Sequence, residues 1–199
     1  MDWSLSDARG RRKYLVSMER RDFLQAALDV GGKTGSFCAV LALSGARVSE
    51  VLALTPEHID DNNCAINFET LKRRRRGVTR SVPVPRKLLY YLEGVHQYRS
   101  AQADLSASEK RLWPWCRTTA WRRVKFVMRR AMVPPFLAKP KALRHAFGAE
   151  AALNQVSLTL IKKWMGHSRI ETTEIYTSLI GKEERSLARL TWKKAEKLF

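Results

Sequence analysis

The chain has 199 residues, and its 45% hydrophobic content is enough for a folded core and excludes a disordered chain. Its formal net charge of +18 indicates a polyanionic partner such as DNA, RNA or an acidic membrane surface. The N-terminus lacks the apolar segment of a secretory signal, and no apolar run approaches the ~18 residues that span a bilayer. We therefore expect neither export nor membrane insertion.

The three cysteines, Cys38, Cys64 and Cys116, are widely spaced and form no CxxC pair. This pattern favours reduced thiols over a disulfide framework or a metal site. The expected compartment is the cytoplasm, where a basic protein of this kind would associate with the nucleoid.

The first half of the chain predicts three helices. After a loose polar segment at 1–12, apolar residues recur at helical spacing over 18–30, with Ser17 as the N-cap and Gly31 at the end. Two further helices, joined by a hinge at Gly45, are expected at 34–46 and 47–54.

Residues 64–85 form the only convincing β region. Two alternating segments, 65–68 and 80–84, flank a strongly basic turn that contains Gly77. The pattern predicts an antiparallel hairpin.

The second half of the chain predicts helices only. They are expected at 86–99, 119–132, 141–154, 157–165, 169–179 and 182–198. Ser157 and Gly166 match the caps of the fourth of these helices, and Ser168 with Glu171 matches a capping box for the fifth. The predicted fold is mainly α with a small antiparallel β-hairpin sheet (α+β), in a single domain spanning 1–199.

Metal-dependent chemistry has little support in the sequence. Carboxylates that could hold Mg²⁺ stand as adjacent pairs at 60–61 and 183–184, which are typical of a solvated turn and a helix start. His145 and His167 are isolated, and VGGKTGS at 30–36 lacks the spacing of a P-loop. We expect no metal ion and no cofactor.

Metal-free phosphoryl transfer remains open to such a basic chain. It needs guanidinium groups on the nonbridging oxygens, a nucleophile, a base for its proton and an acid for the leaving oxygen. Arginine suits the first role because its planar fork donates two hydrogen bonds and stays charged. Lysine can serve as the acid, and tyrosine can be the nucleophile if its phenol, with a pKa near 10, is activated.

Four short motifs carry a resemblance at this point. They are SGARVSEVLAL with Arg47, KALRH with Arg144, MGH with His167, and Tyr176 nine residues later. Together they resemble the catalytic domain of the tyrosine recombinase (phage integrase) family, in the order typical of that family and with its basic hairpin between the first two. The resemblance covers about Gly10 to Leu190.

The resemblance implies a role for each matching residue. Arg47 and Arg144 would clamp the scissile phosphate, and His167 would donate to a nonbridging oxygen. Tyr176 would attack phosphorus and leave a 3′-phosphotyrosyl link. Lys72, at the entry to the hairpin turn, would protonate the departing 5′ oxygen.

Three further residues would assist. Lys141 stands where many family members carry histidine, and it would help to remove the phenol proton or hold the phosphate. Glu50, one helical turn after Arg47, would orient the site, and His145 would support it from behind.

Two basic segments are predicted to contact the DNA. One is the hairpin, where a solvated charge run is the alternative interpretation, and the other is the helix at 119–132. The expected DNA-binding residues are Arg73, Arg74, Arg75, Arg76, Arg80, Arg122, Arg123 and Lys125.

The sequence therefore predicts a site-specific DNA recombinase, or integrase, of a mobile element, which needs neither metal nor ATP. A non-catalytic DNA-binding regulator and a type IB topoisomerase-like relaxing enzyme are the alternatives. The expected partners are double-stranded DNA and further copies of the chain in a tetramer. The segment at 182–199 could dock on a neighbouring copy or pack back on its own domain. Because the resemblance starts so near Met1, we expect no N-terminal core-binding domain in this chain, which is then either a stand-alone minimal member of the family or a fragment. A separate DNA-binding protein could take the place of that domain.

Overall fold

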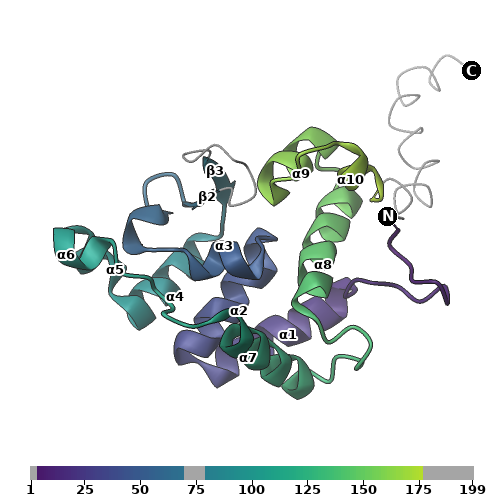
Figure 1. Cartoon of the computed structure of the whole chain (residues 1–199), viewed down its shortest axis with the longest axis horizontal. Helices are drawn as coiled ribbons and strands as arrows, with labels where there is room; N and C mark the ends of the chain where they lie inside the picture. The colour runs from purple at the N-terminus through teal and green to yellow at the C-terminus, as the bar shows by residue number, and fades with distance from the viewer. Residues whose placement is uncertain (1–3, 70–78, 177–199) are drawn as a thin grey trace, which may run out of the picture.

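The computed structural model describes residues 4–69 and 79–176, in which helices surround one small antiparallel sheet (Figure 1). In chain order the elements are α1 Ser17–Val30, α2 Gly32–Ser44, α3 Val48–Leu52, the 3-10 helix η1 Pro56–His58, β1 Ile59–Asp60, β2 Ala65–Glu69, β3 Thr79–Pro83, α4 Arg86–His96, α5 Tyr98–Gln102, α6 Leu105–Ser108, α7 Arg117–Arg130, α8 Pro140–Leu153, α9 Leu158–Met165 and α10 Glu171–Glu174. The mainly α fold with a small antiparallel sheet is confirmed.

Helix α2 lies at the centre of the main core. Residues 34–42 are all buried, because α1, α4, α7 and α8 pack around the helix (Figure 1). A helix that is apolar on every side is expected to be enclosed in this way. Gly45 ends α2 with a left-handed φ of 62°, and a Cβ there would lie 2.4 Å from the ring of Phe147. This turn delivers the chain to Arg47 and α3.

The sheet has the strand order β1-β2-β3, and both pairs of neighbours are antiparallel. Its register pairs Ile66 with Val82 and Phe68 with Arg80. In β3 the residues at 80 and 82 point into the protein, while the residues at 79, 81 and 83 are exposed. Arg80 therefore shares the buried face with Val82, as the two-residue period of a strand requires.

The C-terminal helices of the described chain form a second, smaller core. Leu5, Ile161, Met165 and Tyr176 are buried in it beside the alanines of α8. The cluster joins the N-terminal segment to α8, α9 and the end of α10.

Several predicted boundaries need correction. The N-cap of α1 is Val16, whose N–H donates to the Glu19 carboxylate, and Ser17 is the first helical residue. The predicted capping box of Ser168 does not form, because α10 begins at Glu171 after Ile170 with no side-chain cap bond. The caps at Ser157 and Gly166 are confirmed.

Other differences concern short elements. The predicted helix at 86–99 is split into α4 and α5, while β1 and α6 had no clear sequence signal. Tyr176 follows the short α10, although a longer helix was predicted over 169–179. The predicted helix at 182–198 lies outside the described residues. Within the described part of the chain, no helix has both the length and the apolar character needed to cross a membrane.

Candidate active site

Arg47 occupies the N-cap position of α3, directly after the turn at Gly45. Its Nη1 donates to Oε1 of Glu50 at 2.7 Å, and its backbone N–H donates to Oε2 of the same carboxylate at 2.8 Å. Its Nη2 lies 3.4 Å from the carbonyl oxygen of Gly166. The Arg47 side chain is 29% exposed and that of Glu50 only 1%. The carboxylate thus holds the guanidinium from the protein side and leaves its outer edge open.

Arg144 reaches the same place from α8. Its Nη1 donates to the carbonyl oxygen of Gly45 and its Nη2 to that of Met165, both at 2.6 Å. A guanidinium has five N–H donors, so these two bonds leave three for a ligand. Burial and the nearby positive charge of Arg47 lower the pKa of Arg144 to about 9, so the group stays charged at neutral pH. A bound anion would relieve this repulsion.

His167 comes directly after the left-handed Gly166 that ends α9. Its Nδ1 lies 2.9 Å from the hydroxyl oxygen of Thr173 on α10, so Nε2 is the ring nitrogen left for a ligand. Burial, followed by the charges of Arg144 and Arg47, lowers its pKa to about 3. The imidazole is therefore neutral at pH 7.

Tyr176 is fully buried, and its phenol oxygen lies 3.2 Å from Nδ1 of His145. Its ring packs against Gly148 of α8, where a Cβ would come within 2.3 Å of the ring carbon Cζ. Burial raises the pKa of the Tyr176 phenol and lowers that of His145 to about 4, so both groups are neutral at pH 7. Nε2 of His145 is buried and has no hydrogen-bond partner among the described residues.

These side chains meet at one pocket of about 700 Å³. Five of the six residues predicted for catalysis line this pocket, and the predicted supporting residue His145 lines it with them. The five are Arg47, Lys141, Arg144, His167 and Tyr176. Lys141 is exposed in the first turn of α8. Glu50 lies behind Arg47. Lys72 and Arg73–Arg76 lie outside the described residues, so their roles stay predictions.

Arg80 is buried, whereas a residue that contacts DNA must be exposed on the surface. Its side chain is only 6% exposed, its Nη2 donates to Glu50 at 2.7 Å, and its Nε donates to the carbonyl oxygen of Trp164 at 2.8 Å. The prediction of a DNA contact at Arg80 is wrong in this structure because the register of β3 turns the residue inward, beside Val82.

Helix α7 borders the same pocket. Arg117 and Trp121 line it, and neither was predicted. Arg122 and Arg123 are exposed on the helix, while Lys125 is half-buried with its amine 4.6 Å from the centre of the Trp121 ring. The helix contains basic residues and no acidic ones, so a basic surface adjoins the pocket. The sequence signal for Arg117 was its place at the start of this basic helix.

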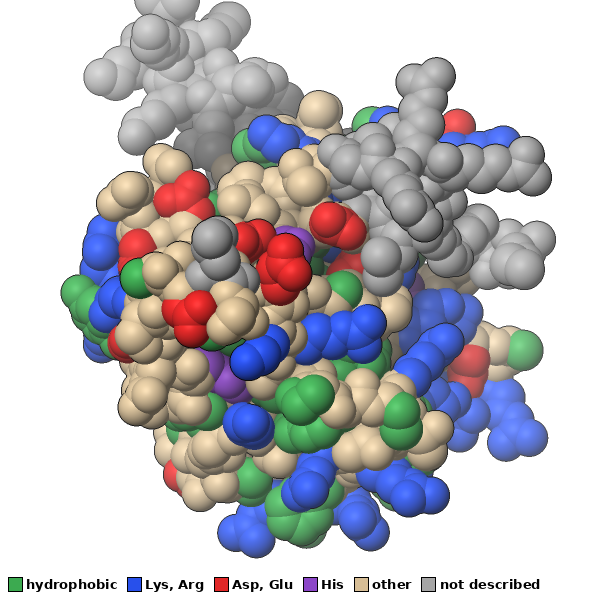
Figure 2. Space-filling model, turned by 60° about the vertical axis from the view of Figure 1, so that its left-hand side comes forward, with side chains coloured by type: hydrophobic (Ala, Val, Ile, Leu, Met, Phe, Trp, Pro, Cys, Tyr) green, Lys and Arg blue, Asp and Glu red, His purple; other side chains and the backbone are tan. Residues whose placement is uncertain are grey.

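Charge is unevenly spread over the surface. The end of the molecule that carries α5 and α6 comes forward in Figure 2. Acidic side chains gather in the upper part of this view, and Lys and Arg side chains are most numerous in the lower and right-hand parts. Among residues 4–69 and 79–176, no group of three or more His, Cys, Asp or Glu side chains is placed to hold a metal ion.

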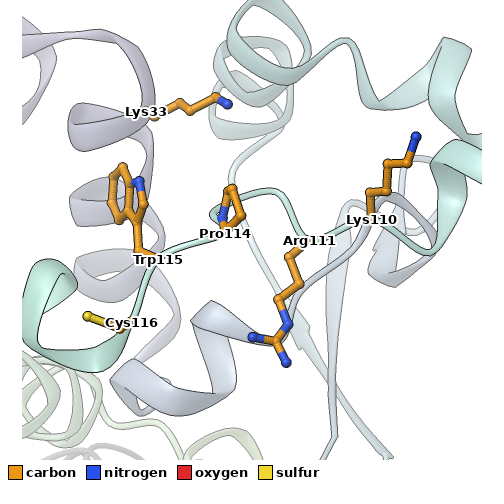
Figure 3. Close-up of a pocket in the computed structure, with 6 residues that line it drawn as sticks. All are labelled: Lys33, Lys110, Arg111, Pro114, Trp115 and Cys116. Carbon is orange, nitrogen blue, oxygen red and sulfur yellow. The ribbon is translucent and has the colours of Figure 1, made fainter.

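A second, shallower pocket of about 630 Å³ lies before the start of α7 (Figure 3). It is lined by Lys33, Lys110, Arg111, Pro114, Trp115 and Cys116. Figure 3 shows the side chains of Lys110 and Arg111 pointing apart rather than converging on one point. The arrangement is that of a basic surface and does not form a focused anion site.

Residues 15–182 match the model of the phage integrase family. Among curated proteins, the chain is 25% identical over 174 residues to the tyrosine recombinase XerD of Pasteurella multocida, an alignment that covers 83% of the chain and 57% of that protein. It is 29% identical over 145 residues to the tyrosine recombinase XerA of Pyrococcus furiosus, with 70% and 48% covered. The chain spans about half the length of these relatives.

Solved structures agree on the fold. The crystal structure of XerA recombinase matches with a TM-score of 0.71 at 22% identity, over 87% of this chain and 64% of that one. The catalytic domain of bacteriophage HP1 integrase matches with a TM-score of 0.59 at 22% identity, over 83% and 87%. XerH bound to its difH substrate matches with a TM-score of 0.69 at 16% identity, over 92% and 59%.

The matched range contains all four motifs, and the solved structures share the fold. The chain belongs to the phage integrase family of tyrosine recombinases.

Proposed function

We propose that this protein cuts and rejoins DNA at specific sites through a covalent 3′-phosphotyrosyl intermediate. The observation that carries the proposal is the meeting of Arg47, Arg144, His167 and Tyr176 at one pocket from four separate segments of the chain. A pure DNA-binding surface needs positive charge but no tyrosine enclosed among phosphate-binding groups.

The two guanidiniums and His167 would bind the scissile phosphate. Arg47 and Arg144 retain N–H donors after their bonds to the protein, and these can reach the nonbridging oxygens. A neutral His167 that accepts from Thr173 at Nδ1 carries its proton on Nε2 and can donate it to the same oxygens. Because the positive charge is already in place, it stabilises the extra negative charge of the five-coordinate transition state.

The reaction exchanges one phosphate ester for another. The phenol oxygen of Tyr176 bonds to phosphorus, and the bond from phosphorus to the 5′ oxygen breaks. The phenol proton passes to Lys141, which can accept it only in its uncharged amine form, and Lys72 gives a proton to the departing 5′ oxygen. A 5′-hydroxyl of a second strand then attacks the phosphotyrosine in the reverse sequence. Since the number of phosphate ester bonds is conserved, no ATP is required, and the guanidiniums with His167 would stabilise the phosphate charge in place of a metal ion.

The buried tyrosine implies a movement before cleavage. Tyr176 is fully enclosed between His145 and Gly148, and its phenol is protonated there. Because the ring is fully enclosed at the edge of the pocket, we expect it to leave this position and lose contact with Nδ1 of His145 when it attacks a phosphate held by the arginines. Docking of DNA beside α10 would supply the free energy for that step.

Double-stranded DNA is the proposed substrate, and the basic helix α7 beside the pocket is a proposed contact surface. A structural relative, XerH, was solved bound to its difH substrate in a pre-cleavage complex. Strand exchange between two duplexes would require four copies of this chain, and we propose a tetramer on DNA.

Covalent capture in cells tests the proposal. The chain and its Tyr176→Phe variant are expressed, the cells are lysed in SDS, and the DNA that stays attached to protein is sequenced. Tyr90→Phe is the matched control, because Tyr90 is 56% exposed on α4 and does not line the pocket. We expect adducts at a few discrete sites for the wild type and the control, and none for Tyr176→Phe.

Each other outcome is informative. Tyrosine-dependent adducts scattered over the genome would favour a relaxing enzyme of the type IB topoisomerase kind. Tight DNA binding without any adduct would favour a non-catalytic regulator. Adducts that persist in Tyr176→Phe would refute Tyr176 as the nucleophile.

A further inference from the structure

The three consecutive carbonyl groups that precede His167 each accept a hydrogen bond from a different arginine. Nε of Arg80 donates to the carbonyl oxygen of Trp164 at 2.8 Å, and Nη2 of Arg144 donates to that of Met165 at 2.6 Å. Nη2 of Arg47 approaches that of Gly166 at 3.4 Å. These carbonyls end helix α9, where oxygens lack helical partners and the helix dipole favours positive charge.

The three arginines come from three different elements. Arg47 is the N-cap of α3, Arg80 is the second residue of β3, and Arg144 lies in α8. Their common target therefore ties α3, the sheet and α8 to the end of α9. The backbone that carries His167 is therefore held by side chains distant in sequence as well as by the cap of α9, where the His167 N–H donates to the carbonyl oxygen of Lys162.

Arg80 is set apart from the other two by its second bond. Its Nη2 donates to Oε2 of Glu50 at 2.7 Å, while Oε1 of that carboxylate accepts from Arg47, also at 2.7 Å. Glu50 is thus shared by two guanidiniums, and its side chain is almost completely buried at 1% exposure. Because Arg80 binds Oε2, the orientation of the Glu50 carboxylate is fixed, and Oε1 is directed at the guanidinium of Arg47.

Packing confines Arg80 itself. Its guanidinium lies 5.1 Å from the centre of the Phe68 ring, on the neighbouring strand. At Gly166, whose φ is 63°, a Cβ would lie 3.0 Å from Cζ of Arg80. Because Gly166 has no side chain, the guanidinium of Arg80 can pack directly against its backbone.

We propose that Arg80 is a positioning residue for strand cleavage, which sets Arg47 through Glu50 and His167 through the carbonyl of Trp164. This inference rests on the proposed function and adds to it a residue that touches neither substrate nor Tyr176. Arginine suits the role because its fork can donate to a carboxylate and a carbonyl in fixed directions, whereas the ammonium of lysine is a single point of charge. With Arg80 in place, Arg47 and His167 are already positioned when the phosphate binds.

The first test measures the positions directly and needs no DNA. Side-chain Nε–Hε signals are recorded by NMR on ¹⁵N-arginine-labelled protein, and Arg47→Lys identifies the Arg47 signal. Arg80→Met keeps a long apolar side chain beside Phe68, and Arg80→Lys also keeps the charge in case the first variant does not fold. Arg99→Met is the matched control, because Arg99 forms an ion pair with Asp61 away from the pocket.

We expect the Arg47 signal to shift and broaden in both Arg80 variants, and to stay unchanged in Arg99→Met. An unchanged Arg47 signal in a folded Arg80 variant overturns the inference. This readout is independent of cleavage, so it decides the link between Arg80 and Arg47 even if no covalent adduct forms and the proposed function fails.

The second test uses a DNA duplex that contains a cleavage site identified by the covalent capture experiment. A misplaced clamp should slow adduct formation in Arg80→Lys by about 100-fold. A neutral methylphosphonate at the scissile position removes the charge that the clamp must stabilise, so the deficit relative to wild type should shrink to about 10-fold or less. A deficit of equal size on both substrates would indicate a general structural defect and would overturn the positioning role.

Discussion

A single methyl group at position 148 should force Tyr176 out of its buried position. A Cβ on Gly148 would lie 2.3 Å from Cζ, 2.6 Å from Cε2 and 2.7 Å from the phenol oxygen of Tyr176. None of these atoms can share that space with a methyl group, so in Gly148→Ala either the ring or the helix must move. The φ of Gly148 is not positive, so steric exclusion is the cost and backbone strain is absent.

The size of the effect follows from two opposing terms. Alanine stabilises a helix interior by about 0.8–1 kcal/mol relative to glycine, while overpacking costs about 1–3 kcal/mol and loss of the buried ring costs more. With the ring expelled, at about 3–5 kcal/mol, less the helix gain, we expect Gly148→Ala to lose about 2–4 kcal/mol of unfolding free energy. The matched control is Gly94→Ala in α4, because a Cβ there meets nothing within 4 Å and the helix gain should appear alone.

Two assays check this prediction. Urea unfolding compares the free energies of the wild type, Gly148→Ala and Gly94→Ala. Absorbance titration of the phenols above pH 9 should show that the raised pKa of Tyr176 falls back toward its ordinary value of 10.0 when the ring is expelled. If Gly148→Ala were as stable as Gly94→Ala and its phenol titration matched the wild type, the buried position of Tyr176 would be refuted.

Three further predictions concern the rest of the site and its surroundings. Burial lowers the pKa values of His145 and His167 from 6.5 to about 4 and about 3, so the unfolded chain binds more protons below pH 6.5. Stability should therefore be complete above pH 6.5 and fall as the pH drops, by about 2 kcal/mol for each histidine at pH 5, measured by urea unfolding. Glu50→Gln should cost about 3–5 kcal/mol in the same assay, because two guanidiniums lose a buried counter-charge, and a loss below about 1 kcal/mol would contradict the shared ion pair. Replacing Arg122 and Arg123 by alanine should reduce the slope of log affinity against log salt by about 2 on a nonspecific duplex, measured by fluorescence anisotropy, and an unchanged slope would exclude α7 as a contact.

Local chemistry explains which parts of the fold were predictable. The helix that precedes His167 could be placed from Ser157 and Gly166, since a capping hydroxyl and a left-handed glycine act within one turn of the chain. Strands β2 and β3 were also found from their alternation, while the two-residue β1 was too short to show one. The capping box at Ser168 failed because the helix starts only at Glu171, which makes Glu171 its first residue instead of the third residue after a cap.

The sequence also determined which residue types the site holds and their order along the chain. The motifs around Arg47, Arg144, His167 and Tyr176 were enough to indicate the family, and the family model agrees. The side of the sheet that Arg80 faces was decided by tertiary structure, because an alternating strand has two faces and only packing shows which one is covered. A local signal was nonetheless present, since Arg80 stands two residues before the apolar Val82.

The position of Tyr176 could be decided only by tertiary structure. The space for its ring is provided by Gly148, and its hydrogen-bond partner is His145, about thirty residues earlier in the chain. Likewise, the three arginines that hold the carbonyls before His167 come from α3, β3 and α8. A sequence states which groups are available, but desolvation and like-charge proximity, which lower the pKa values of Arg144 and His167, exist only when distant segments have packed together.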